Sequence, residues 1–151
     1  MLTPLGPQLI EYNVRFGDPE TEVLMLRLES DLLDLLLATT DGTLATARPV
    51  WRAASAVTVV MAANGYPAAP VTGSIIAGID AAEVVGATVF HAGTAFATDG
   101  TLVATGGRVL AVTALGRDIG DARAAAYAGI DAIDWPGGFC RRDIGQQGLG
   151  E

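Results

Sequence analysis

The sequence contains no lysine. Its nine basic residues are all arginines and are outnumbered by seventeen acidic residues, so the formal net charge is -8. Without lysine, the chain cannot supply the ammonium group of a P-loop or of a Schiff-base enzyme. The negative charge argues against non-specific binding to nucleic acid, which needs cations opposite the phosphates. Two explanations of the exclusive use of arginine stay open: genomic base composition, which is the simpler, and functional clusters of guanidinium groups.

Cysteine and long apolar runs are also scarce. Cys140 is the only cysteine, so no internal disulfide can form, which agrees with a reducing compartment. The longest apolar runs, at residues 32–38 and 53–63, are shorter than the roughly 20 residues of a membrane-spanning helix. Residues 1–7 lack the basic and apolar regions of a secretory signal. We therefore predict a cytoplasmic protein with no membrane partner and no nucleic-acid partner.

The hydrophobic content favours a folded domain. Half of the 151 residues are hydrophobic and only 17% are charged, which is typical of a globule that can bury a core. Asp18, Pro19 and Glu20 predict the start of a helix, because each suits the first turn. Apolar residues at a spacing near 3.6 continue this helix to about Thr39, and Asp41-Gly42 ends it.

Most other segments are typical of strands. Residues 7–14 follow a turn-like stretch and predict a strand that would be an edge in this chain, which suggests that its neighbours lie outside it. Further strands are predicted at residues 56–62, 88–91, 95–97, 101–104 and 108–114, with a turn at 64–67 and a hairpin at Asp99-Gly100. Residues 118–133 predict an alanine-rich helix. The order indicates an α+β fold with a small, mostly antiparallel sheet and one or two helices.

The densest polar cluster is Glu11, Asn13 and Arg15. On a strand these side chains would emerge on the same face, because they are two residues apart. A carboxylate and an amide oxygen are ligands that Mg²⁺ accepts beside substrate phosphates, and an arginine can stabilise a transferring phosphoryl group. The alternative is a solvated strand face with a Glu11–Arg15 ion pair, which the spacing alone favours.

Residues 9–22 closely resemble the signature of the phosphoribosylamine–glycine ligases, which belong to the ATP-grasp superfamily. The most specific stretch is residues 15–20, which read RFGDPE. The resemblance continues, in order, through residues 28–36, 59–67, 89–94, 106–114 and 141–145, and so covers nearly the whole chain. It implies that residues 1–45 are the terminal strand and helix of an ATP-grasp unit. Residues 46–151 would then be the small, mostly antiparallel C-terminal domain of the synthetase.

The resemblance also implies an activity. Enzymes of this family join phosphoribosylamine and glycine in de novo purine biosynthesis, convert ATP to ADP and phosphate, and pass through a glycyl phosphate. Their amino-terminal domain and ATP-grasp nucleotide-binding lobes would precede this chain, which we therefore expect to be inactive alone. The alternative is a non-catalytic binding or assembly module that retains the fold.

By the same resemblance, Glu11 and Asn13 would bind Mg²⁺ or Mn²⁺ on the ATP phosphates. Arg15 would be catalytic and face the transferring phosphoryl group. Asp18 would bind the amine of the ribosylamine substrate. A plain helix cap is the alternative for Asp18 and stays open.

By the same resemblance, Arg108 would bind the substrate phosphate, after two glycines that would let backbone amides approach it. Arg141 and Arg142 could bind a second anion, although solvated or ion-paired arginines are the favoured interpretation near a terminus. His91, the only histidine, would either border the substrate or have a structural role. Cys140 has no partner histidine nearby and should be inert.

Overall fold

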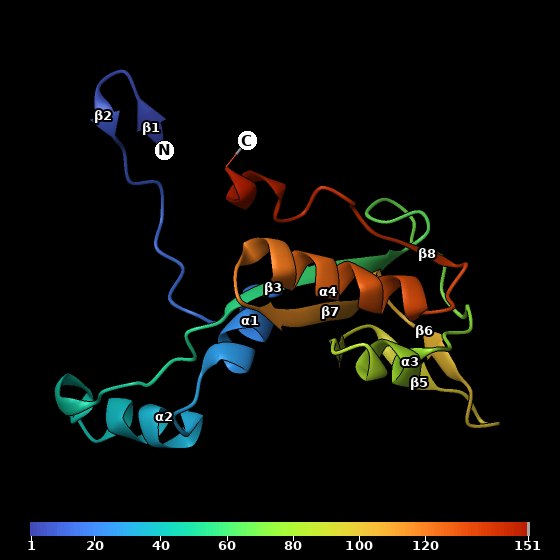
Figure 1. Ribbon diagram of the computed structural model, residues 1–151, viewed down its shortest axis with the longest axis horizontal. Helices are drawn as coiled ribbons and strands as arrows, with labels where there is room; N and C mark the ends of the chain where they lie inside the picture. Colours follow the sequence, from blue (N-terminus) through green and yellow to red (C-terminus); the bar gives the residue numbers. More distant parts are fainter. Residues whose placement is uncertain (151) are drawn as a thin grey trace.

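The computed structural model describes residues 1–150 (Figure 1). A four-stranded antiparallel sheet, in the order β4-β7-β3-β8, forms its centre. Its strands are β3 (Ser55–Ala63), β4 (Thr88–His91), β7 (Arg108–Gly116) and β8 (Gly138–Phe139). Two small hairpins pair β1 (Leu2–Thr3) with β2 (Gly6–Pro7) and β5 (Thr94–Phe96) with β6 (Leu102–Ala104). The α-helices are α1 (Glu20–Arg27), α2 (Leu32–Thr40), α3 (Ile79–Val84) and α4 (Ile119–Ala132).

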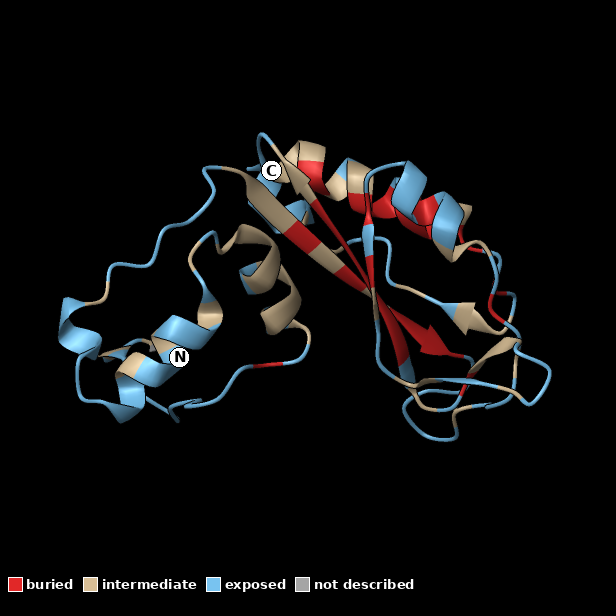
Figure 2. Cartoon of the chain, turned by 90° about the horizontal axis from the view of Figure 1, so that it is seen from below, coloured by how far each residue is buried: buried red, intermediate tan, exposed pale blue. Residues whose placement is uncertain are grey.

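The core lies between α4 and one face of the sheet. Alternate residues of β3, namely Val57, Val59 and Met61, are buried on this face, as the period of two of a strand requires. In β7, Leu110 and Val112 pair with Met61 and Val59 and are equally buried. Figure 2 shows that the buried residues are concentrated in β3, β7 and α4.

Helix α4 covers this face because its small residues recur at helical spacing. Ala122, Ala126, Tyr127 and Ile130 are buried. The helix begins after Asp118, whose carboxylate accepts a hydrogen bond from the backbone N–H of Asp121 at 2.8 Å. The predicted helix at 118–133 is thus confirmed.

The predicted strands from residue 56 onward are also confirmed, within two residues at each end. Between β5 and β6, the Asp99 carboxylate accepts a hydrogen bond from the backbone N–H of Thr101 at 2.9 Å, in the expected hairpin turn. The 3₁₀ helices Leu44–Thr46 and Gln146–Leu149 and helix α3 were not predicted. Helix α3 is too short to show a clear apolar period.

Two predictions for the N-terminal part are wrong. Residues 8–16 form no strand, because no strand of the described chain lies beside them to accept their backbone hydrogen bonds. The predicted helix over 18–39 is two helices, since Leu28 adopts an extended conformation and pairs with Trp51. Asp31 then caps α2, with its carboxylate accepting from the N–H of Leu33 at 2.7 Å.

The N-terminal part therefore contributes almost nothing to the core. Neither α1 nor α2 has a buried residue, and α2 lies well away from the sheet (Figures 1 and 2). A pocket of about 290 Å³ opens between the two helices and the segment that follows them, and it is lined mostly by leucines with Phe16 and Trp51. Among the described residues, no helix has the length and apolar character to cross a membrane.

Candidate functional site

The structure brings together the two residues predicted to bind substrate, Asp18 and Arg108. They are 90 residues apart in sequence, yet Nη2 of Arg108 donates to Oδ2 of Asp18 at 3.0 Å. Nη1 of the same guanidinium lies 3.3 Å from the backbone carbonyl oxygen of Asp18 and donates to it. Asp18 is not a helix cap, because Pro19 occupies the N-cap position of α1 and no side chain caps that helix. The capping alternative is therefore wrong.

Arg108 is placed by the main sheet. It begins β7 and lies opposite Ala62 of β3, at a point where the register shifts by one residue. Its side chain remains 43% exposed and that of Asp18 54% exposed, so the ion pair lies in contact with solvent. An exposed pair of this kind stabilises a fold only weakly. Stability alone therefore does not explain why Asp18 and Arg108 pair.

Arg108 also lines a pocket of about 290 Å³ on the sheet face opposite α4. Thr58, Val60 and Ala62 form part of its wall, because they alternate along β3 with the core residues that face the helix. The other lining residues are Pro19, Tyr66, Phe139, Cys140, Arg141 and Ile144. The volume lies at the small end of the range for ligand sites. Its lining is mostly apolar and includes two arginines, Arg108 and Arg141.

The glycines before Arg108 have a packing role in this structure. A Cβ atom on Gly107 would lie 2.4 Å from Cδ2 of Tyr66, so only glycine lets this ring take its place beside the pocket. The carbonyl oxygen of Gly107 accepts a hydrogen bond from the N–H of Ala63 at 2.8 Å, which fixes the strand ends. The sequence suggested a phosphate-binding role for these glycines, and the structure supplies a second reason for Gly107.

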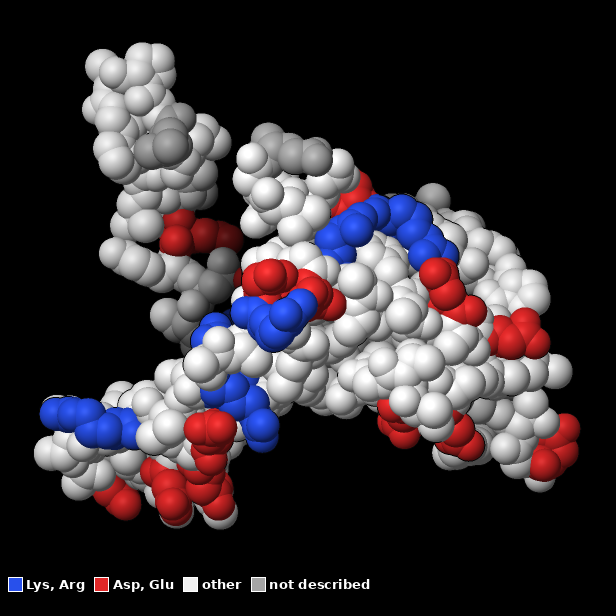
Figure 3. Space-filling view, viewed as in Figure 1, with Lys and Arg blue, Asp and Glu red and all other residues white. Residues whose placement is uncertain are grey.

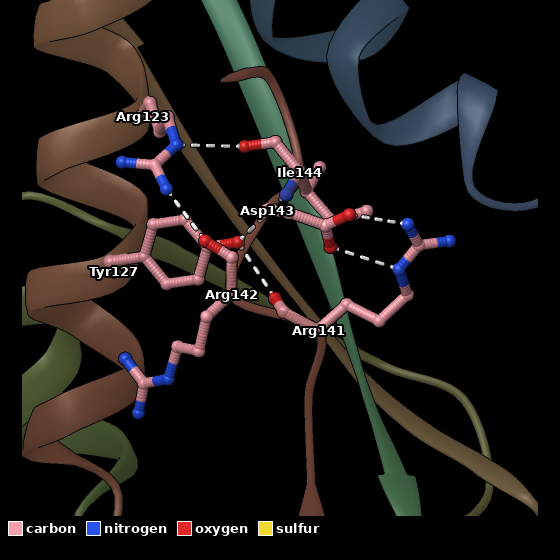
Figure 4. A network of polar contacts seen from close by, with 6 residues as sticks. All are labelled: Arg123, Tyr127, Arg141, Arg142, Asp143 and Ile144. Atoms are coloured by element: carbon pink, nitrogen blue, oxygen red, sulfur yellow. Dashed lines mark hydrogen bonds and ion pairs between the residues drawn. The ribbon is translucent and has the colours of Figure 1, made fainter. Parts of the chain in front are cut away.

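Part of the pocket is lined by the C-terminal segment 140–144, which α4 holds in place (Figure 4). The hydroxyl of Tyr127 donates to the carbonyl oxygen of Arg141 at 2.7 Å and accepts from the N–H of Ile144 at 3.1 Å. Arg123 donates to the carbonyl oxygens of Ile144 at 2.9 Å and of Arg142 at 2.6 Å, and its guanidinium lies over the Tyr127 ring at 4.7 Å. These contacts were not predicted, since they depend on how the tail folds back.

The two arginines of this segment are ion-paired, as the favoured interpretation of the sequence held. Arg141 binds both carboxylate oxygens of Asp143, at 2.9 and 2.5 Å, and this hydrogen bonding holds the pKa of Asp143 below its usual value. Arg142 pairs with Asp131 of α4 at 2.7 Å. In the view of Figure 3, several basic side chains lie beside acidic ones, and the longest run of basic side chains is a short arc at the upper edge of the domain.

The remaining predicted residues lie outside the pocket. Glu11 and Asn13 are exposed neighbours, with Nδ2 of Asn13 donating to Oε1 of Glu11 at 3.5 Å. Arg15 donates to the carbonyl oxygen of Phe16 at 3.3 Å, and no ion pair joins it to Glu11 in the part of the chain described. The structure thus offers one carboxylate and one amide as possible ligands, which suits a cation completed by phosphates. Their metal-binding role stays a prediction.

The surroundings of His91 and Cys140 give neither residue a reactive role. Nδ1 of His91 lies 3.1 Å from the hydroxyl of Thr94, across the turn between β4 and β5, and His91 does not line the pocket. Cys140 does line the pocket, and its partial burial raises the pKa of its thiol. A higher pKa lowers the fraction of reactive thiolate at neutral pH. Among residues 1–150, no cluster of three histidine, cysteine, aspartate or glutamate side chains could hold a metal ion.

Fold and pocket together define a mixed α/β domain with a mostly antiparallel sheet, a helix on one face and a small pocket lined in part by Arg108 on the other. The model of one family matches residues 56–147, and its description is "Phosphoribosylglycinamide synthetase, C domain". Because this match covers more than half of the chain, the chain belongs to that family. The resemblance inferred from the sequence is therefore confirmed.

Relatives and a solved structure agree with this assignment. The chain is 58% identical over 149 residues to a phosphoribosylamine–glycine ligase of Mesorhizobium japonicum, covering 99% of the chain and 35% of that protein. It is 55% identical over 145 residues to a chloroplastic phosphoribosylamine–glycine ligase of Arabidopsis thaliana, covering 95% of the chain and 27% of the relative. The crystal structure of the Thermotoga maritima phosphoribosylamine–glycine ligase superposes with a TM-score of 0.72 at 35% identity, over 95% of this chain and 35% of that one.

The chain thus spans about a third of the length of these ligases or less. The mixed α/β fold with mostly antiparallel strands is confirmed by the crystal structure. The assignment of residues 1–45 to an ATP-grasp unit and of residues 46–151 to a separate domain stays a prediction. What the relatives catalyse comes to this chain only as a proposal.

Proposed function

We propose that this chain forms the C-terminal portion of a cytoplasmic ligase that joins phosphoribosylamine and glycine in de novo purine biosynthesis. The complete enzyme would convert ATP to ADP and phosphate. The single observation that carries the proposal is the Asp18–Arg108 ion pair beside the 290 Å³ pocket, in a chain of the synthetase family.

The two charges of this pair suit the two ends of phosphoribosylamine. That substrate has an amine on one side of its ribose ring and a phosphate on the other. In our proposal the guanidinium of Arg108 binds the phosphate, since its forked N–H groups match two phosphate oxygens. The carboxylate of Asp18 accepts hydrogen bonds from the amine and orients its nitrogen. Both side chains are at least 43% exposed, so a ligand can reach them from solvent.

The phosphoryl-transfer residues would be those of the exposed N-terminal segment. Glu11 and Asn13 supply oxygen ligands for Mg²⁺ or Mn²⁺, and Arg15 faces the transferring phosphoryl group. When bound, the cation would neutralise negative charge on the ATP phosphates. Because the protein provides only two of its ligands here, the nucleotide phosphates and water must complete the set.

In this proposal the chain has negligible activity alone. It accounts for 35% of the length of the Mesorhizobium ligase and contains no lysine to hold nucleotide phosphates. Phosphoryl transfer depends on positioning and on electrostatic stabilisation from all sides of a closed site. The nucleotide-binding lobes would therefore have to come from the remainder of the ligase polypeptide.

A complementation experiment tests the proposal. The chain is mixed with a polypeptide supplying the remaining lobes, and ADP formation is measured with and without glycine and phosphoribosylamine. We expect activity that requires both substrates. R108Q should raise the KM for phosphoribosylamine by about 10- to 100-fold, the loss expected for a charge-assisted hydrogen bond.

The matched control is R117Q, because Arg117 also forms an exposed ion pair, with Asp121, but does not line the pocket. R117Q should leave the KM unchanged. Mixtures in which ADP formation never depends on the two substrates would support the alternative, a non-catalytic assembly module. That alternative would use the exposed apolar side chains of α1 and α2 to contact another chain.

A further inference from the structure

We propose that the Asp18 carboxylate is a gate over the Arg108 pocket, and that a small phosphomonoester opens it by displacing Asp18 from the guanidinium. Asp18 would then act first as a competitor of the ligand's phosphate. Only after displacement would it be free to bind a cationic group of the same ligand. This inference rests on the proposed function, because it takes Arg108 to be the phosphate ligand.

Both terminal nitrogens of Arg108 already have a hydrogen-bond partner in this structure. They both donate to Asp18, one to the carboxylate at 3.0 Å and the other to the backbone carbonyl oxygen at 3.3 Å. Two parallel donors are the feature by which arginine recognises phosphate. A phosphate cannot take this bidentate position while Asp18 holds it. Binding of a phosphate across the two terminal nitrogens therefore requires an exchange of partners.

Exchange of Asp18 for a phosphate on Arg108 is energetically feasible. The ion pair is about half exposed on both sides, and pairs in such contact with water are weak. A phosphomonoester carries more negative charge than a carboxylate near neutral pH and has three acceptor oxygens. It should compete well for the same guanidinium. The carboxylate of Asp18 loses little when water replaces Arg108.

A small pocket adjoins the Asp18–Arg108 pair. The pocket of about 290 Å³ is bounded by Val60, Tyr66 and Phe139, and Arg141 also contributes to its mostly apolar lining. Arg141 also pairs with an aspartate, Asp143, through both carboxylate oxygens. Two arginines therefore line the pocket, and each forms an ion pair with an aspartate. Its size suits a ligand no larger than a sugar phosphate.

The gate also couples the pocket to the N-terminal part of the chain. Among the described residues, the Asp18–Arg108 pair is the one ion pair that joins residues before β3 to the sheet domain, since the other pairs all lie within residues 117–143. Displacing Asp18 would remove this link at the entrance to α1. Ligand binding should therefore loosen residues 16–19 relative to β7.

The test measures binding of ribose 5-phosphate to the full chain by NMR titration. This probe has a phosphate but no amine, so it tests the phosphate contact without a cationic group that could bind Asp18. D18N should bind the probe about two- to five-fold more tightly than the wild type, which is the factor expected when a weak exposed ion pair no longer competes. D18A, which leaves no side-chain acceptor at all, should bind at least as tightly as D18N. R108Q should lose binding.

The matched control is D121N, which removes the acceptor of the Arg117 ion pair outside the pocket and should leave probe affinity unchanged. If R108Q loses binding but D18N and D18A bind no more tightly than the wild type, the gate is wrong while Arg108 keeps its proposed role. Undiminished binding by R108Q would overturn both. Failure of the wild type and D18N alike to bind millimolar probe would also overturn the gate.

Discussion

Replacing Tyr127 with phenylalanine removes one oxygen atom and should loosen the C-terminal segment that lines the pocket. Tyr127 is only 8% exposed, and its hydroxyl makes two of the four hydrogen bonds that tie α4 to the backbone of residues 141–144. Phenylalanine keeps the ring, its burial and its contact with the Arg123 guanidinium. The change therefore isolates the two hydrogen bonds.

The expected cost follows from those two bonds. Each contributes about 0.5–1.5 kcal/mol net, so Y127F should lower the free energy of unfolding by about 1–3 kcal/mol. Urea denaturation followed by circular dichroism measures this difference. The local effect is measured by amide hydrogen exchange, which should speed up at Ile144 in Y127F and stay unchanged at Val59 in the core.

Tyr12 provides the control, because it is 78% exposed and lies in a segment without regular structure. Y12F should unfold at the same urea concentration as the wild type. If Y127F unfolds together with Y12F and the Ile144 amide exchanges at the wild-type rate, the Tyr127 hydroxyl does not hold the C-terminal segment. The C-terminal segment would then be held in place without the two hydrogen bonds of Tyr127.

Two further predictions concern the same pocket. G107A places a Cβ atom 2.4 Å from the Tyr66 ring and should destabilise the fold by about 1–3 kcal/mol in urea denaturation, whereas G106A, with its nearest neighbour at 3.3 Å, should cost less. Equal costs would contradict the packing role of Gly107. Burial raises the pKa of Cys140, so less thiolate exists at a given pH and alkylation by iodoacetamide should be slower than in the urea-unfolded chain, with its rise shifted to higher pH. Equal rates in both states would show that burial does not protect the thiol.

Much of the domain after residue 55 was predictable from local pattern. Alternation in β3 and the small residues of α4 specify which face is buried, and Asp99-Gly100 specifies a hairpin, because these signals depend only on neighbours in sequence. For the N-terminal part, local pattern predicted the wrong elements. Leu28 sits in a continuous apolar helix pattern, yet it pairs with Trp51, a partner that no local signal near Leu28 can reveal.

For the candidate site, the sequence supplied residue types and their family resemblance. Asp18 and Arg108 were both predicted to bind substrate, but nothing in their spacing indicates that they form an ion pair with each other. The role of Glu11 and Asn13 was argued from a strand that the structure does not contain. That prediction now rests on the resemblance and not on alternation along a strand.

The sequence by itself determined the family, the elements of the sheet domain and the identity of the charged residues near the pocket. Only the tertiary structure decided that β7 and the segment before α1 meet, that the C-terminal tail returns to α4 through Tyr127, and that a pocket lies between them. The physical reason is that helices and strands follow from the local periodicity of side chains. Contacts between residues 90 positions apart depend on how the whole chain packs.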